Sequence, residues 1–96
     1  MLDVVIKGGM VVDGTGSPPT RTDIGINGEK VDIIGDLSLA EARRIIDATG
    51  LTVSPGFIDS HVHSDAALLV DPQHAASLRQ GVTTEILGQD GLSYAP

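Results

Sequence analysis

Short apolar runs separated by turn residues fill the first half of this 96-residue chain. Such a pattern is typical of antiparallel strands. Asn27-Gly28 lies between two of the runs, and this pair favours a tight hairpin turn. We therefore predict a β-rich N-terminal region, with strands over residues 2–7, 10–12, 22–26, 30–34, 44–48 and 51–53 and a Gly- and Pro-rich loop over residues 13–19.

One short helix is also predicted in this half, over residues 39–44. Ser38 is placed to cap its N-terminus, and Glu41 follows three residues later in the capping-box position.

The pattern changes after the corner Ser54-Pro55-Gly56. We predict a strand over residues 57–63, a helix that begins at Asp71-Pro72 and ends at Gly81, and a strand over residues 82–87. Strand, helix and strand form a βαβ unit, the building block of parallel sheets and barrels. We therefore expect two parts, residues 1–53 and residues 54–96.

Composition and charge exclude several classes of protein. The net charge is −7, which opposes binding to nucleic acid or to an anionic membrane. The chain has no cysteine, so it can form neither a disulfide nor a thiolate metal site. The N-terminus lacks a signal-peptide pattern, and no apolar run approaches the roughly 20 residues of a membrane helix. We expect a cytoplasmic protein with no nucleic-acid or membrane partner.

Two of the three histidines lie one residue apart in the stretch SPGFIDSHVHSD. In a strand, Asp59, His61 and His63 would share one face, so two imidazoles could bind the same divalent metal ion. The spacing alone is equally compatible with two hydrogen-bonded histidines and no metal. Their position near a strand end favours a metal site, because functional residues of parallel barrels gather there. His74 lies in the predicted helix, where a surface or packing role is expected.

Several segments together resemble a known family. They resemble the N-terminal part of the amidohydrolase superfamily, and most closely the N-acyl-D-amino-acid deacylases (D-aminoacylases). The segments are VVIKGGMVVDGTG, TDIGINGEKVDIIG, IDATGLTVSPGFIDSHVH and GVTTEILGQDG, followed by GQDGLSYAP, and the resemblance covers nearly the whole chain.

The resemblance implies an α/β fold. Residues 1–53 would be the N-terminal part of a small β-sandwich, and residues 54–96 the first strand-helix-strand of a (β/α)8 TIM-like barrel that is incomplete in this chain. It also implies a metal-dependent hydrolase of C–N amide bonds, which deacylates N-acyl-D-amino acids. By motif, His61 and His63 would be metal ligands. The implied cofactor is one or two divalent metal ions, zinc first, although other divalent metals would also be possible.

Asp90 departs from the family pattern. It stands where these deacylases usually carry a bridging Cys, within Gly-Asn-Cys-Gly. We expect its carboxylate to replace the thiolate as a metal ligand, which would make the site harder and could change the preferred metal. The alternative is an Asp that braces the loop between Gly88 and Gly91.

Two further acids are candidates for supporting roles. Asp59 is expected to contact a ligand imidazole and fix its tautomer, as outer-shell carboxylates often do. Asp65 could orient a ligand, meet the substrate or cap the segment that follows it.

The general acid/base and the other metal ligands of the family have no counterpart among these residues and are expected beyond Pro96. We therefore expect the remaining barrel segment, or a partner chain that supplies it, within an oligomer that acts on a small-molecule substrate. Two alternatives remain: a cyclic amidase of the dihydroorotase or hydantoinase kind, and a non-catalytic interaction subunit with a vestigial metal motif.

Overall fold

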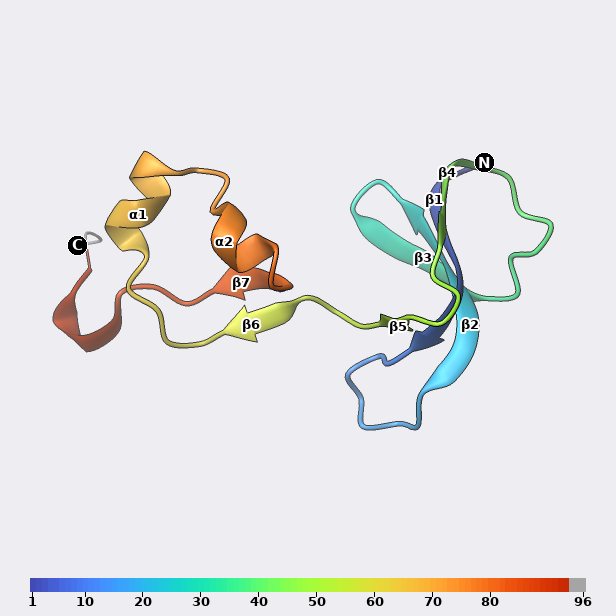
Figure 1. The fold of residues 1–96 in the computed structure, drawn as a ribbon, viewed down its shortest axis with the longest axis horizontal. Helices are drawn as coiled ribbons and strands as arrows, with labels where there is room; N and C mark the ends of the chain where they lie inside the picture. The colour runs from blue at the N-terminus through green and yellow to red at the C-terminus, as the bar shows by residue number, and fades with distance from the viewer. Residues whose placement is uncertain (94–96) are drawn as a thin grey trace. The chain divides into compact units, whose positions relative to one another are not determined.

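The computed structural model describes residues 1–93, and the chain divides into two compact units, Met1–Pro55 and Gly56–Pro96. Figure 1 labels the elements of both units. The end of the predicted segment GQDGLSYAP, residues 94–96, lies outside the described part. None of the helices in residues 1–93 is long and apolar enough to cross a membrane.

The first unit is a mixed five-stranded sheet. Four strands follow the order β3-β2-β1-β4, and the short β5 also pairs with β1. The hairpin between β2 and β3 is confirmed: Asn27 pairs with Lys30, and Gly28 takes a positive φ of 55° in the turn. The strands are β1 (Leu2–Val11), β2 (Thr20–Asn27), β3 (Lys30–Gly35), β4 (Ala42–Asp47) and β5 (Thr52–Val53).

The antiparallel pairing that is typical of such short apolar runs is present between β1 and β2 and between β2 and β3, but not in the whole sheet. β1 pairs in parallel with both β4 and β5. The connection after β3, residues 36–41, brings the chain to the far side of β1, so that β4 enters in the same direction as β1. Leu37 of this connection is buried against Leu2 and Val5, which form the core cluster of the unit. Burial of these apolar side chains stabilises the crossover.

The helix predicted over residues 39–44 is also wrong. The backbone groups that would form it are used by the sheet: the Leu2 amide donates to the Glu41 carbonyl oxygen at 3.0 Å, and Ala42 begins β4. Ser38 does not cap a helix; its amide donates to Asp36 Oδ1 at 2.9 Å within a turn. A segment this short gains little from local helical bonds, so pairing with β1 prevails.

The two strands predicted over residues 2–7 and 10–12 are one strand with a β-bulge. Between Ile6 and Gly9 the register with β2 shifts, and Gly8 has φ +71°. Asp23 lies opposite the bulge: Oδ1 accepts the Gly8 amide at 2.8 Å, and Oδ2 accepts the Leu37 amide at 2.9 Å. One carboxylate therefore pairs the amide freed by the bulge and also ties the crossover connection to the sheet.

The second unit contains two parallel strands, β6 (Phe57–Asp59) and β7 (Val82–Glu85), so the predicted strand-helix-strand with parallel pairing is confirmed. At the start of β6 a Cβ on Gly56 would overlap the Thr83 side chain, so this close approach of the strands requires glycine. The connection holds α1 (Asp65–Val70) and α2 (Ala75–Leu78), and the 3₁₀ turn η1 (Gln89–Gly91) follows β7.

The helix of the connection differs from its prediction. α2 begins at Ala75 instead of at Asp71-Pro72, because His74 has a left-handed backbone conformation (φ 46°) that separates the preceding turn from the helix. α1 was not predicted at all. Ser64-Asp65 before Ala66-Ala67 is a helix-start signal that could have indicated it.

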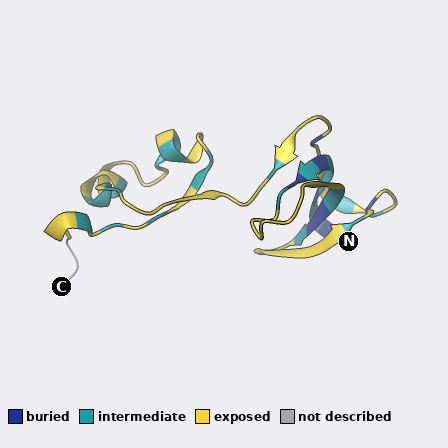
Figure 2. Cartoon of the chain, turned by 90° about the horizontal axis from the view of Figure 1, so that it is seen from below, coloured by how far each residue is buried: buried dark blue, intermediate teal, exposed yellow. Residues whose placement is uncertain are grey.

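Burial differs sharply between the two units. Figure 2 shows the buried residues in the sheet of the first unit, whereas no described residue of the second unit, 56–93, is buried. Phe57 and Ile58 of β6 are 59% and 67% exposed. The described part of the second unit therefore has no buried apolar core.

Candidate metal centre

The strand that carries the histidine motif is shorter than predicted. β6 ends at Asp59, whose carbonyl oxygen accepts the Ile86 amide at 2.9 Å. The His61 amide then donates to Asp59 Oδ1 at 3.3 Å, within the bend that follows the strand. His61 and His63 therefore lie in the loop after the strand, and their common direction comes from that loop instead of from strand alternation.

Asp90 lies in the corresponding loop after β7. Its backbone is left-handed, with φ 56° and ψ 31°, and its neighbours Gly88 and Gly91 also have positive φ values. Asp tolerates this region better than most residues with a Cβ, but an outlier of this kind marks a place where function can compensate for strain. The course of the loop that carries Asp90 therefore depends on the left-handed conformations of residues 88, 90 and 91, and not on pairing with a neighbouring strand.

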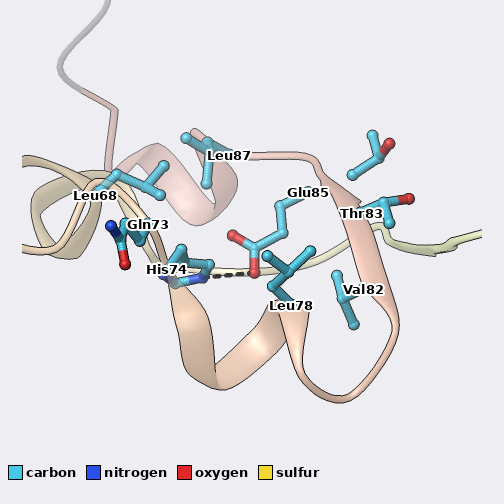
Figure 3. Close-up of a pocket in the computed structure, with 9 residues that line it drawn as sticks. Leu68, Gln73, His74, Leu78, Val82, Thr83, Glu85 and Leu87 are labelled. Atoms are coloured by element: carbon cyan, nitrogen blue, oxygen red, sulfur yellow. Dashed lines mark hydrogen bonds and ion pairs between the residues drawn. The ribbon is translucent and has the colours of Figure 1, made fainter. Parts of the chain in front are cut away.

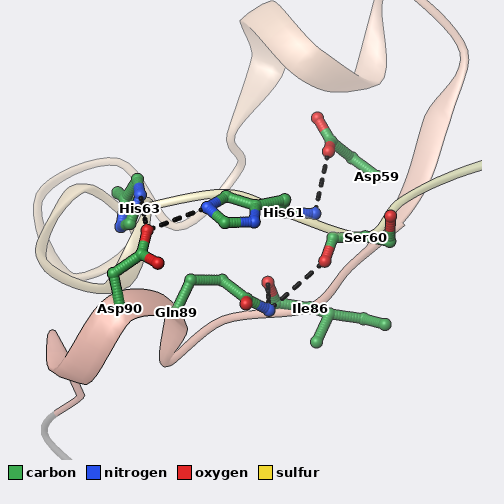
Figure 4. Close-up of polar contacts among 7 residues, drawn as sticks. All are labelled: Asp59, Ser60, His61, His63, Ile86, Gln89 and Asp90. Carbon is green, nitrogen blue, oxygen red and sulfur yellow. Dashed lines mark hydrogen bonds and ion pairs between the residues drawn. The ribbon is translucent and has the colours of Figure 1, made fainter.

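The two loops bring three side chains together (Figure 4). One oxygen, Asp90 Oδ2, lies 3.0 Å from His61 Nε2 and 3.3 Å from His63 Nε2. The imidazole rings are 5.3 Å apart and nearly perpendicular. The three side chains are between 45% and 64% exposed, so the group faces solvent. One ligand atom from each residue can be chosen so that all lie within 4.8 Å of one another.

This donor set fits a divalent metal ion. Two ligands that each lie about 2.1 Å from one ion stand roughly 3.0 to 3.4 Å apart, depending on its geometry, and the two Asp90–imidazole distances fall in that range. Imidazole and carboxylate are ligands of zinc and of other first-row metals. Three ligands leave coordination positions for further protein ligands and for water or substrate.

The two supporting acids occupy different places. Asp59 contacts the His61 backbone amide, not an imidazole ring. Asp65 is the first residue of α1 and is not one of the three converging side chains. Together with His63, Gly91 and Leu92 it lines a hollow of about 320 Å³ next to the candidate centre.

One contact between the two loops has no counterpart among the residues singled out from the sequence. The Gln89 side-chain amide donates to the Ser60 carbonyl oxygen at 3.2 Å and to the Ile86 carbonyl oxygen at 3.3 Å. Ser60 precedes His61, and Gln89 itself precedes Asp90. The adjacency of Gln89 to Asp90 was the available signal, but the sequence contains nothing that indicates its carbonyl partners.

His74 is not a simple surface or packing residue. Its Nε2 lies 2.8 Å from Glu85 Oε1 at the end of β7 (Figure 3). Ser77 Oγ lies 3.1 Å from the same nitrogen. Burial by itself would raise the pKa of Glu85, but hydrogen bonds from His74 and Ser77 and the charge of His74 outweigh it. The pKa of Glu85 therefore lies below its ordinary value of 4.5. This pair joins the start of α2 to the end of β7.

The chain has two units, and in the second unit the loops after two parallel strands bring two histidines and a carboxylate together. The model of the Amidohydrolase family matches residues 44–95, more than half of the sequence, and the chain belongs to this family.

The similar proteins include several deacylases. The chain is 48% identical over 95 residues to N-acyl-D-glutamate deacylase of Alcaligenes xylosoxydans xylosoxydans, with 99% of this chain and 20% of the relative covered. A structure of N-acyl-D-glutamate deacylase from Bordetella bronchiseptica, complexed with zinc and a phosphonate inhibitor, superposes with a TM-score of 0.95 at 42% identity over 99% of this chain and 20% of the other.

A D-aminoacylase structure, described with a binuclear metal centre, superposes with a TM-score of 0.94 at 46% identity over 100% of this chain and 20% of its own. The chain therefore spans about a fifth of the length of the relatives that it matches.

Proposed function

We propose that this chain supplies part of the metal centre of an amidohydrolase that removes the acyl group from N-acyl-D-amino acids. The observation that carries the proposal is the convergence of Asp90 on His61 and His63, from loops that follow two neighbouring parallel strands. The similar deacylases, one of them bound to zinc and a phosphonate inhibitor, support the reaction class.

In this proposal residues 1–53 contribute strands to a small β-sandwich, and residues 54–96 are the first strand-helix-strand of a (β/α)8 barrel. The parallel pairing of β6 with β7 supports this arrangement. So do the exposed apolar side chains of β6, which elements outside the chain would cover in a complete barrel. The rest of the barrel, or a partner chain, would supply the general acid/base and the remaining ligands.

His61, His63 and Asp90 would hold zinc or a similar divalent metal. When bound, such a metal polarises the amide carbonyl and lowers the pKa of a coordinated water. The three side chains of this chain would hold the ion, and the contacts of Asp90 Oδ2 with both imidazoles link the loop after β6 to the loop after β7. Asp90 Oδ1 has no role in the two contacts to the imidazoles and would be available to a second ion.

Hydrolysis of N-acetyl-D-amino acids, including N-acetyl-D-glutamate, tests the proposal when it is measured beside the L enantiomers, dihydroorotate and hydantoin. We expect D-selective release of the free amino acid by the zinc-loaded enzyme that includes the rest of the barrel, and loss of this activity when that enzyme carries Asp90→Ala. Hydrolysis of the cyclic amides alone would favour a cyclic amidase. Metal content that is unchanged in Asp90→Ala and in His61→Ala would favour a non-catalytic subunit.

A further inference from the structure

The position of the Asp90 carboxylate depends on how far apart the two loops lie. His61 and His63 belong to the loop after β6, and Asp90 belongs to the loop after β7. The strand ladder ends with the bond from the Ile86 amide to the Asp59 carbonyl oxygen. Beyond that bond, a contact between the loops is needed to hold a carboxylate against two imidazoles, because a metal site tolerates only a few tenths of an ångström of error.

Gln89 makes a contact of this kind. Its Nε2 atom lies 3.2 Å from the Ser60 carbonyl oxygen and 3.3 Å from the Ile86 carbonyl oxygen, so one amide group joins the residue before His61 to the end of β7 (Figure 4). Both partners are backbone carbonyls, which can only accept. The nitrogen of the Gln89 amide must therefore face them, and both of its hydrogens are used.

The backbone around Gln89 makes the orientation of Asp90 depend on the hydrogen bonds of the Gln89 side chain. Gly88 and Gly91 flank it with positive φ, and Asp90 is itself left-handed, so the local chain has few strand or helix bonds that would orient the carboxylate. The Gln89 side chain holds the residue directly before Asp90 against the loop of His61. The Gln89 side chain therefore sets the distance between Asp90 on one loop and the two histidines on the other.

We propose that Gln89 is a positioning residue of the metal centre, which acts through Asp90 by holding the two loops at the ligand distance. This inference rests on the proposed function, since it requires that His61, His63 and Asp90 bind a metal. Groups that orient metal ligands in this way typically contribute about 10- to 100-fold to metal affinity.

The test measures Zn²⁺ affinity by competition with a chromophoric chelator, and the visible spectrum of the Co²⁺-loaded protein. We expect Gln89→Ala to weaken Zn²⁺ binding by about 10- to 100-fold and to move the Co²⁺ spectrum toward that of Asp90→Ala. Gln89→Glu, which keeps the shape but turns both donors into acceptors facing carbonyl oxygens, should bind at least as weakly as Gln89→Ala.

Gln80→Ala is the matched control. Gln80 also donates its side-chain amide to a backbone carbonyl oxygen of the second unit, that of Ala76 at 3.2 Å, but this bond lies within the α2 region and away from the ligands. We expect its Zn²⁺ affinity and Co²⁺ spectrum to match those of the unmodified protein. Thermal unfolding of the metal-free proteins should be the same for both glutamine variants.

The double variant Gln89→Ala/Asp90→Ala decides whether Gln89 acts through Asp90. We expect it to bind Zn²⁺ no more weakly than Asp90→Ala alone, because the ligands of this chain that remain, His61 and His63, share one loop. Equal weakening in both backgrounds, full affinity in Gln89→Ala, or full affinity in Gln89→Glu would overturn the inference. If Asp90→Ala and His61→Ala also keep full affinity, the proposed function fails; if only the Gln89 variants do, the proposed function stands.

Discussion

Asp90 Oδ2 lies 3.0 Å from His61 Nε2, although the two residues are 29 positions apart in the sequence. The same oxygen lies 3.3 Å from His63 Nε2. This contact joins the loops that follow two parallel strands, and in parallel barrels functional groups gather at such strand ends. Two testable consequences follow from it, one for the histidines and one for Asp90.

Removal of His61 or His63 should lower the metal content of the protein, whereas removal of His74 should not. We expect His61→Ala and His63→Ala each to lower zinc affinity by more than the ~10- to 100-fold that loss of an outer-shell partner costs. His74→Ala is the matched control, because His74 pairs with Glu85 and is not among the three converging side chains. Bound zinc can be counted by mass spectrometry of metals after gel filtration. Equal loss of zinc in all three variants would contradict the assignment.

Asp90→Cys should change which metal the site prefers. A thiolate is softer than a carboxylate, so we expect the ratio of zinc to manganese affinity to rise tenfold or more, which is about 1.4 kcal/mol. Competition between the two metals measures this ratio. Asp71→Cys controls for a thiol placed elsewhere in the second unit, on an exposed turn residue. A ratio that is the same in both variants would show that Asp90 does not bind the ion.

Asp23→Ala should destabilise the first unit. The carboxylate accepts the Gly8 and Leu37 amides at 2.8 and 2.9 Å, and its removal leaves two partly buried donors unpaired. We expect a loss of about 1–3 kcal/mol in the free energy of unfolding, measured by urea denaturation.

Asp32→Ala is the control for this prediction. Asp32 accepts the Asn27 side-chain amide at 2.9 Å on an exposed part of the hairpin, so its loss should cost less than about 0.5 kcal/mol. If Asp32→Ala lowers the free energy of unfolding as much as Asp23→Ala does, the contacts of Asp23 at the bulge stabilise the unit no more than an exposed hydrogen bond.

The contribution of Glu85 to stability should depend on pH. Because its pKa in the folded protein is below 4.5, folding favours the ionised carboxylate. The stabilisation is fully present above pH 4.5 and is lost as the pH falls through the lowered pKa. His74 is the titratable group that faces Glu85, and its Nε2 lies 2.8 Å from Glu85 Oε1.

We therefore expect the melting temperature of Glu85→Gln to lie below that of the unmodified protein at neutral pH, and the gap to close below pH 4.5. Thermal melts across this range check the expectation. Glu29→Gln, in the exposed hairpin turn, should show no such gap. A gap for Glu85→Gln that stays constant down to acid pH would argue against ionisation as its cause.

Local signals in the sequence were sufficient for several features. Asn27-Gly28 predicts the hairpin because glycine takes the positive φ of the turn at little cost. The β-branched residues of β7 predict a strand in the second unit, and His61 and His63 follow β6 closely enough to be recognised as a pair. These features depend on residues that are near one another in the chain.

Long-range pairing decided the features that local signals could not indicate. Residues 39–44 have a capping-box pattern, yet Ala42–Asp47 forms β4, because β1 offers it a parallel partner and Leu37 is buried on the core. The sequence pattern places His74 within a helix, yet its ring contacts Glu85 at the end of β7 and is only partly exposed.

The sequence by itself determined which residue types could bind a metal and where two of them lie. Only the tertiary structure decided that Asp90 meets both imidazoles and that Gln89 joins their loops. The reason is geometric: the pairing of β6 with β7 brings their following loops together, and no periodicity within either loop encodes that distance.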